Sequence, residues 1–197
     1  DNTETINIDE IGEFEVYPNR DSLKYRKLYN LDDIQTMKRG TIRKVGFSKS
    51  WNMLIRLGLT DDSYRINNSK NMSIREFTNC FLPYDPNKSI EKKVQKELKI
   101  KSFNEEMEKL KAINLFDDKK KIRTDNGTPA EILEEILRDI WKLEKNDRDM
   151  IIMYHEFKYR NGNKIKKITS TMVCIGDNKK FTAMSKTVGL PLAIASI

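Results

Sequence analysis

Three arginines in the first quarter of the chain are the residues best suited to bind a ligand. They occur in two short segments, 17–22 (Tyr-Pro-Asn-Arg-Asp-Ser) and 39–43 (Arg-Gly-Thr-Ile-Arg). A guanidinium group is a planar fork of N–H donors that binds a carboxylate through two parallel hydrogen bonds. Several forks suit a small molecule with more than one carboxylate, and nearby hydroxyl and amide groups can add contacts. The predicted substrate-binding residues are Arg20, Arg43, Arg39, Asn19, Ser22 and Thr41.

The same arginines also have an ordinary structural interpretation. Arg20 can pair with the neighbouring Asp21 or with Asp149, and Arg39 can lie on the surface beside Lys38. The two interpretations differ in geometry, because a ligand site requires the arginines to converge on one pocket, whereas surface charges are scattered.

Other kinds of chemistry have little support in the sequence. The eight glycines form neither Gly-x-Gly-x-x-Gly nor Gly-x-x-x-x-Gly-Lys-Ser/Thr, so no phosphate cradle of the dinucleotide-binding kind is present and cofactor-binding residues stay unknown. The only histidine, His155, has no partner at metal-ligand spacing, and we expect a packed or surface side chain. Cys80 and Cys174 have apolar neighbours and predict two buried thiols. We assign no catalytic residue and no metal site.

Composition and charge argue against two further classes of protein. Hydrophobic residues make up 38% of the chain and charged residues 34%, as in a soluble globular protein. No apolar run approaches the roughly 20 residues of a membrane span, and the acidic, polar first residues are unlike a targeting segment. The net charge of +7 comes from lysines interleaved with acidic residues, as in segment 89–98. We therefore expect no nucleic-acid partner and no membrane partner.

A site of this kind must be positioned by regular elements, and the sequence predicts several. Segment 13–17 alternates polar and apolar residues before a proline, as a half-buried strand does. Asp21 or Ser22 can cap a short helix rich in tyrosine. Further helices are expected over 47–57, from Ser73, from a capping box at 102–105 and from a second capping box at 128–131.

The sequence period changes in the last quarter of the chain. Segments 149–160 and 164–175 are rich in β-branched and aromatic residues and flank Asn161-Gly162, a strong hairpin signal. A helical pattern follows over 182–197, with a kink or break expected near Pro191. Together the patterns predict an α+β fold: a mixed or antiparallel sheet domain, shared by both β segments and interrupted by an inserted helical lobe.

Several segments resemble the C-terminal part of saccharopine dehydrogenase, an enzyme of lysine metabolism. The resemblance is carried by 17–22 and 39–43, and further on by 147–153 (Asp-Arg-Asp-Met-Ile-Ile-Met) and 181–191 (Phe-Thr-Ala-Met-Ser-Lys-Thr-Val-Gly-Leu-Pro). Order and approximate spacing agree with the family, whereas the middle, about 60–140, matches only as helical sequence. The sequence departs from the family pattern just after the 39–43 motif, at Lys44-Val45, and just before the 181–191 motif, at Lys179-Lys180.

The resemblance implies both an architecture and a role. It places a β-sheet domain for dimerisation and substrate binding at 1–35 and 146–197, around an inserted α-helical subdomain at 36–145. Members of the family oxidise the secondary amine of saccharopine with NAD or NADP, an oxidoreductase reaction that yields glutamate and 2-aminoadipate 6-semialdehyde. Because this sequence lacks a dinucleotide motif, we expect it to be part of a larger enzyme with a missing N-terminal nucleotide-binding domain. This part alone is then expected to bind no cofactor and to be inactive.

Other interpretations stay open at this stage. A non-catalytic module with the same fold could mediate assembly or sense a metabolite, and scattered arginines would favour it. The resemblance further implies a homodimer that binds saccharopine. It implies a cytoplasmic location, or a mitochondrial one if the parent is a fused enzyme of the animal type.

Overall fold

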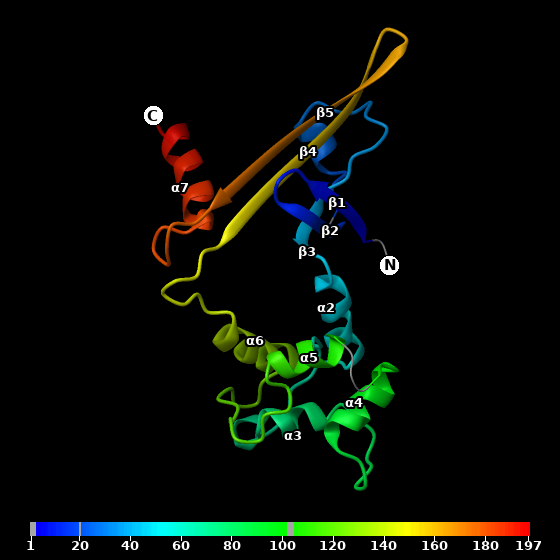
Figure 1. Cartoon of the computed structure of the whole chain (residues 1–197), viewed down its shortest axis with the longest axis vertical. Helices are drawn as coiled ribbons and strands as arrows, with labels where there is room; N and C mark the ends of the chain where they lie inside the picture. Colours follow the sequence, from blue (N-terminus) through cyan, green and yellow to red (C-terminus); the bar gives the residue numbers. More distant parts are fainter. Residues whose placement is uncertain (1–2, 20, 102–104) are drawn as a thin grey trace. The chain divides into compact units, whose positions relative to one another are not determined.

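The structure is a computed structural model that describes residues 3–19, 21–101 and 105–197. Figure 1 draws its helices and strands along the chain. Its contacts fall into two compact units. The first holds the residues before Ile8 together with Glu13–Trp141, and the second holds Ile8–Gly12 together with Lys142–Ile197. No helix in the described ranges is both long enough and apolar enough to cross a membrane.

A three-stranded sheet opens the chain, in the order β1 (Glu4–Ile8), β2 (Gly12–Pro18) and β3 (Gly40–Lys44). Strands β2 and β3 are antiparallel, with Phe14 opposite Lys44 at one end and Pro18 opposite Gly40 at the other. A side chain at Gly40 would overlap that of Val16, so the close approach of the two strands requires glycine. The strand predicted before Pro18 is confirmed, whereas β3 was not predicted.

The rest of the first unit is helical and carries the hydrophobic core. Its helices are α1 (Tyr25–Leu28), α2 (Phe47–Arg56), the 3-10 turn η1 (Ser69–Asn71), α3 (Ile74–Asn79), α4 (Ile90–Leu98), α5 (Glu105–Ala112) and α6 (Pro129–Ile140). Side chains with no exposed surface form the centre of the core: Leu59, Phe77, Val94, Met107, Leu115 and Ile132. Removing such apolar surface from water supplies most of the driving force for packing these short helices.

The helix starts predicted at Ser73 and Thr128 are confirmed, and both have capping boxes, of which only the one at Thr128 was predicted. At α3 the Ser73 hydroxyl accepts a hydrogen bond from the Glu76 N–H at 3.1 Å, and the Glu76 carboxylate accepts one from the Ser73 N–H at 2.6 Å. Thr128 and Glu131 form the same reciprocal pair at α6, where Pro129 occupies the first turn. Each pair satisfies two backbone donors that a helix start leaves open. The box predicted at 102–105 includes residues outside the described ranges.

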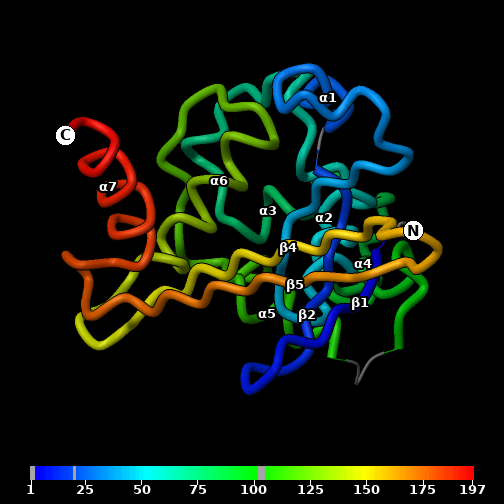
Figure 2. Tube along the Cα trace, turned by 90° about the horizontal axis from the view of Figure 1, so that it is seen from above, coloured from blue at the N-terminus to red at the C-terminus, as the bar shows by residue number. Residues whose placement is uncertain are grey.

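The second unit consists of a long hairpin and one helix. Strands β4 (Met150–Asn161) and β5 (Lys164–Ile175) pair over their whole length and run side by side in Figure 2. Gly162, with φ of 60°, begins the two-residue turn between them. Positive φ costs glycine little, so the predicted hairpin is confirmed, with Gly162 and Asn163 rather than Asn161 and Gly162 inside the turn.

Helix α7 (Ala183–Ala195) is held by two caps. The Thr182 hydroxyl accepts a hydrogen bond from the Ser185 N–H at 3.0 Å, as expected for an N-cap. The Asp149 carboxylate accepts hydrogen bonds from the N–H groups of Ala183 and Met184 at 2.7 and 2.9 Å. The helix continues through Pro191, so the expected break does not occur there.

The α+β class is confirmed, but three local expectations are wrong. The described strands form two separate sheets, so the two β segments do not share one. Cys80, the C-cap of α3, is exposed, and Cys174, the last residue but one of β5, is half-buried, so neither thiol is buried as expected. Helix α1 begins after Lys24 without a side-chain cap. The predicted boundaries at 1–35, 36–145 and 146–197 stay a prediction, and the contacts within this chain divide it at Trp141.

Candidate functional site

Strands β2 and β3 bring the predicted ligand-binding residues onto one sheet face. Arg43 lies opposite Glu15, and Thr41 lies opposite Tyr17. Alternate residues of a strand point to the same side, so these four residues share a face. The pairing extends one residue further, because the Asn19 N–H donates to the Arg39 carbonyl at 2.9 Å. Arg39, Thr41 and Arg43 thus follow one another along this face, which we call the arginine face.

The two arginines of the arginine face, Arg39 and Arg43, each lie against an aromatic ring. The guanidinium carbon of Arg43 lies 5.4 Å from the ring centre of Phe47, and its Nη1 donates to the Ile42 carbonyl at 2.9 Å. The guanidinium carbon of Arg39 lies 5.3 Å from the ring centre of Tyr25, and its Nη1 donates to the Tyr25 hydroxyl at 3.1 Å. Cation–π contacts of this kind orient a guanidinium without neutralising it.

The two arginines keep their charge available. Both are exposed, and within the described ranges neither forms an ion pair with a carboxylate. Other arginines of the same unit do form such pairs: Arg75 with Glu91 at 2.5 Å, and Arg65 with Glu131 at 3.1 Å. The arginine face therefore presents two guanidinium forks that can receive carboxylates from outside the chain.

The remaining candidate residues differ in their involvement. Thr41 is half-buried between the two arginines on the arginine face. Asn19 is half-buried and contributes its backbone to the strand pairing. The Ser22 hydroxyl donates to the Met37 carbonyl at 3.1 Å, which ties the α1 segment to the approach to β3. Arg20 lies outside the described residues, and its role stays a prediction. Asp149, one suggested partner of Arg20, is engaged with α7.

Glu15 is a residue that the sequence did not single out. The residue is only 7% exposed, and its carboxylate accepts hydrogen bonds from the N–H of Gly46 at 3.0 Å and from that of Ser48. It therefore caps α2 from the neighbouring strand. Burial alone would raise the pKa of the Glu15 carboxyl, but the Ser48 and Gly46 hydrogen bonds outweigh burial and hold the pKa below its ordinary value.

Phe47 connects the arginine face to the helical core. Its ring stacks on Tyr17 (centres 6.5 Å apart, planes 7° apart) and on Trp51 (5.9 Å, 10°). Trp51 packs against the hydrophobic core. The row of three rings, Tyr17, Phe47 and Trp51, thus runs from the sheet into the lobe. Helical spacing of Phe47 and Trp51 was visible in the sequence, but the partner from β2 was not.

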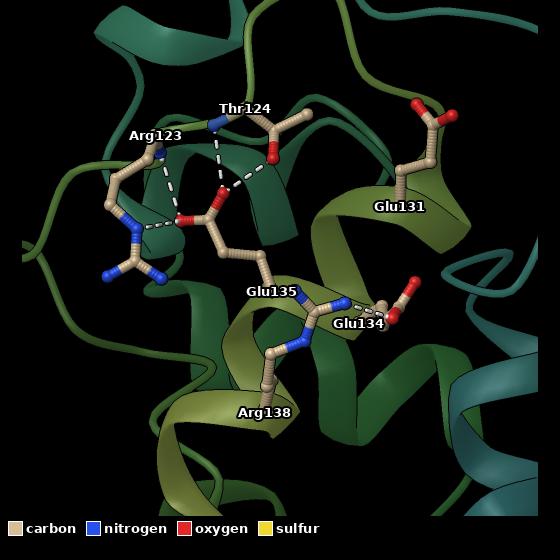
Figure 3. Close-up of a pocket in the computed structure, with 6 residues that line it drawn as sticks. All are labelled: Arg123, Thr124, Glu131, Glu134, Glu135 and Arg138. Carbon is tan, nitrogen blue, oxygen red and sulfur yellow. Dashed lines mark hydrogen bonds and ion pairs between the residues drawn. The ribbon is translucent and has the colours of Figure 1, made fainter.

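A hollow lies beside α6 (Figure 3). Its polar groups already have partners within the chain, and Glu131 pairs with Arg65. The Glu135 carboxylate accepts hydrogen bonds from the N–H groups of Arg123 and Thr124 at 2.9 and 2.8 Å and from the Thr124 hydroxyl at 2.6 Å. Glu134 pairs with Arg138 one turn along the helix. These contacts fasten the segment before α6 to the helix, and we regard the hollow as structural.

Other expectations about chemistry can be compared with the side chains. His155 is exposed and stacks on Phe157 at 6.0 Å, in agreement with a surface histidine. Across the described ranges, no group of three or more His, Cys, Asp or Glu residues could hold a metal ion.

Comparison with known proteins assigns the chain to a family. The model of the saccharopine dehydrogenase C-terminal domain matches residues 1–197. Saccharopine dehydrogenase [NADP(+), L-glutamate-forming] is similar in Schizosaccharomyces pombe (29% identity) and in Saccharomyces cerevisiae (30%), and each alignment covers 93% of this chain and 42% of the relative. The mitochondrial alpha-aminoadipic semialdehyde synthase of Mus musculus is 30% identical over 92% of this chain and 20% of its own length.

The solved structures agree with these relatives. Apo histidine-tagged saccharopine dehydrogenase (L-Glu forming) from Saccharomyces cerevisiae superimposes with a TM-score of 0.83 and 27% identity, over 98% of this chain and 44% of that one. The chain thus spans less than half the length of the yeast relatives it matches. It belongs to the saccharopine dehydrogenase C-terminal domain family.

Proposed function

We propose that the chain is the substrate-binding and dimerisation region of a saccharopine dehydrogenase, and that the arginine face binds saccharopine. One observation carries the proposal: two exposed arginines share a sheet face and, within the described ranges, have no carboxylate partner. In a chain with 30 acidic residues, arginines left unpaired on one face are suited to an acidic ligand.

The spacing of the arginines fits an extended ligand. Arg39 and Arg43 are four residues apart on extended backbone, which separates their Cα atoms by about 13 Å. Saccharopine is a lysine–glutarate conjugate with carboxylates at both ends, so one long molecule can meet both guanidinium groups. The Thr41 hydroxyl lies between them and can hydrogen-bond to the middle of such a ligand.

The chain contributes binding and orientation to the reaction. The NAD or NADP of the family supplies the hydride acceptor, and the yeast relatives are named for NADP. The sequence has no glycine-rich turn before a helix, so its residues do not fit a dinucleotide, and we place the cofactor on the part of the relatives that this chain does not span. On this proposal the chain alone holds saccharopine without oxidising it. We place the enzyme in the cytoplasm, with a mitochondrial location if the parent is a fused enzyme of the animal type; the mouse relative is named as mitochondrial.

The hairpin supports the dimerisation half of the proposal. One face of β4–β5 pairs Met153 with Met172 and Phe157 with Ile168, and all four side chains are between 38% and 56% exposed. The opposite face carries Glu156, which bridges two lysines. An isolated two-stranded ribbon is marginal in water, and an exposed, largely apolar face supports the proposal that this face is covered by a partner. A second copy of the chain is the partner that the family resemblance implies.

Calorimetric titration with saccharopine tests the binding half. Arg39→Ala and Arg43→Ala should each weaken binding by about tenfold or more, equivalent to about 1.4 kcal/mol per fork. Arg138→Ala, an exposed arginine on α6, is the matched control and should bind as the unmodified chain does. Saccharopine binding that is equally strong in all three variants would overturn the assignment of the arginine face.

Sedimentation velocity tests the dimer, and activity separates the alternatives. Phe157→Glu should shift the chain to monomer, whereas Thr171→Glu on the opposite hairpin face should not. Equal association of both variants would refute the proposed interface. A non-catalytic metabolite-sensing or assembly module stays the alternative, because the buried carboxylate on the arginine face, Glu15, is occupied by α2 and no catalytic residue is assigned. Joining the chain to the nucleotide-binding part of the yeast relative and measuring saccharopine-dependent NADP reduction distinguishes enzyme from module.

A further inference from the structure

The start of α2 is unusually well fixed for a surface helix. Phe47, its first residue, lies between Gly46 and Ser48, whose N–H groups both donate to the Glu15 carboxylate. The Phe47 ring also stacks on two other rings, Tyr17 from β2 and Trp51 one turn along the helix. Backbone and ring are therefore anchored independently, the first by a buried carboxylate and the second by stacking.

This anchored ring is the surface on which Arg43 rests. The guanidinium carbon lies 5.4 Å from the ring centre. An arginine side chain has many rotamers and loses much entropy when a ligand fixes it. A guanidinium stacked on an aromatic face is already restricted. Arg43 donates one Nη1 hydrogen bond to the Ile42 carbonyl, and its other N–H groups can bind a carboxylate. An ordered ring therefore reduces the conformational entropy that the arginine loses when a ligand binds.

We propose that Phe47 is a positioning residue, which orders Arg43 in advance for the carboxylate of the ligand. The inference deepens the proposed function and rests on it for the identity of the ligand. The role of Phe47 does not consist of contact with the substrate. It acts through Arg43, and its own position is set by Glu15 and by the row of rings. The Arg39–Tyr25 contact is a separate arrangement on the same face and supplies an internal comparison.

The ligand-free test is nitrogen relaxation at the arginine Nε atoms, measured on the 197-residue chain. In the unmodified chain the Arg43 Nε–H should be ordered. Phe47→Leu should lower its order parameter, Phe47→Tyr should preserve it, and Arg39 should be unaffected in both variants. An Arg43 side chain that is mobile already, or equally ordered with leucine at position 47, overturns the inference. Because this readout needs no ligand, it decides the inference even if saccharopine does not bind.

A double-mutant cycle tests the consequence for binding. Phe47→Leu should weaken saccharopine binding by about threefold, the size expected for an exposed cation–π contact, and Phe47→Tyr should restore it. In the Arg43→Ala background Phe47→Leu should change the affinity by less than twofold, because nothing is left to position. Additive effects would refute positioning and indicate a general disturbance of the fold, which urea unfolding of each variant detects. Loss of binding in Arg43→Ala with none in Phe47→Leu would refute this inference alone and leave the proposed function standing.

Discussion

Replacing Glu15 by glutamine should destabilise the first unit by about 1–2 kcal/mol at neutral pH. The carboxylate accepts two backbone N–H groups at the start of α2, and an N-cap contact is worth about 1 kcal/mol. Its negative charge also faces the positive end of the helix dipole, which adds about 0.3–1 kcal/mol. Glutamine keeps the shape and one acceptor oxygen but loses the charge, so the expected loss lies within the sum of these contributions.

The pH dependence of this difference follows from the lowered pKa of Glu15. The folded pKa lies below the ordinary value of 4.5, so ionised Glu15 stabilises the folded state at all pH values above 4.5. That contribution is lost as the pH falls from 4.5 through the folded pKa, because the protonated carboxyl resembles the glutamine that replaces it. The unmodified chain and Glu15→Gln should therefore differ at pH 7 and converge towards pH 3.

Urea unfolding followed by circular dichroism at 222 nm measures the effect. Titrations at pH 7, 5, 4 and 3 give the free energy of unfolding of both proteins, and Glu13→Gln, an exposed position on the same strand and face, is the matched control. The control should differ from the unmodified chain by less than about 0.5 kcal/mol at every pH. A Glu15→Gln protein as stable as the unmodified chain at pH 7 would refute the capping role. An equal loss at pH 7 and pH 3 would refute its electrostatic origin.

Three further predictions concern other parts of the fold. Asp149→Asn should speed amide exchange at the first residues of α7 by tenfold or more, since hydrogen bonds from Met184 and Ala183 lower the pKa of this carboxyl; unchanged exchange would argue against the cap. Glu91→Gln should lower the free energy of unfolding by about 1 kcal/mol at pH 7, because the Arg75 guanidinium stabilises the carboxylate and solvent screens part of the interaction. The Arg75 guanidinium lowers the pKa of Glu91 to about 2, so this difference should shrink as the pH falls from 4.5 towards 2. A difference in urea unfolding that does not depend on pH would contradict this. Ile132→Ala, in the centre of the core, should cost about 2–5 kcal/mol, and a urea-unfolding loss below 1 kcal/mol would show that the cavity collapses.

Sequence reasoning was most successful where short-range chemistry decides the structure. The capping boxes that begin at Ser73 and Thr128 are complete within four residues, and the hairpin depends on the turn at Gly162. Strand β3 was missed for a related reason. Its five residues include a glycine and a lysine, both poor strand formers, and it is a strand because β2 pairs with it. The pairing is so close that it leaves no room for a side chain at Gly40.

The candidate site was predictable as a set of residue types but not as an arrangement. Arg39 and Arg43 could be chosen from the chemistry of the guanidinium group, whereas their placement on one face depends on the register of β2 against β3. The support for Arg43 comes from further away. Phe47 is near it in sequence, but the ring is fixed by Tyr17 and its backbone by Glu15, thirty-one residues before the Gly46 N–H that it binds. A sequence pattern over a few neighbouring residues cannot predict a contact between residues so far apart in the chain.

Because Arg43, Phe47 and Glu15 have different roles, their variants should differ in ligand affinity and in stability. A substitution of Arg43 removes the fork itself, and its effect should appear only when an acidic ligand is present. A substitution of Glu15 removes the hydrogen bonds that fix the start of α2. The Phe47 ring beside Arg43 is then less well fixed, and the free energy of unfolding falls, so stability and ligand affinity should fall together. Phe47 lies between the two cases, because tyrosine can replace its ring without touching the cap. Measuring affinity and unfolding free energy on the same three variants therefore separates ligand binding, positioning and folding within one strand-to-helix connection.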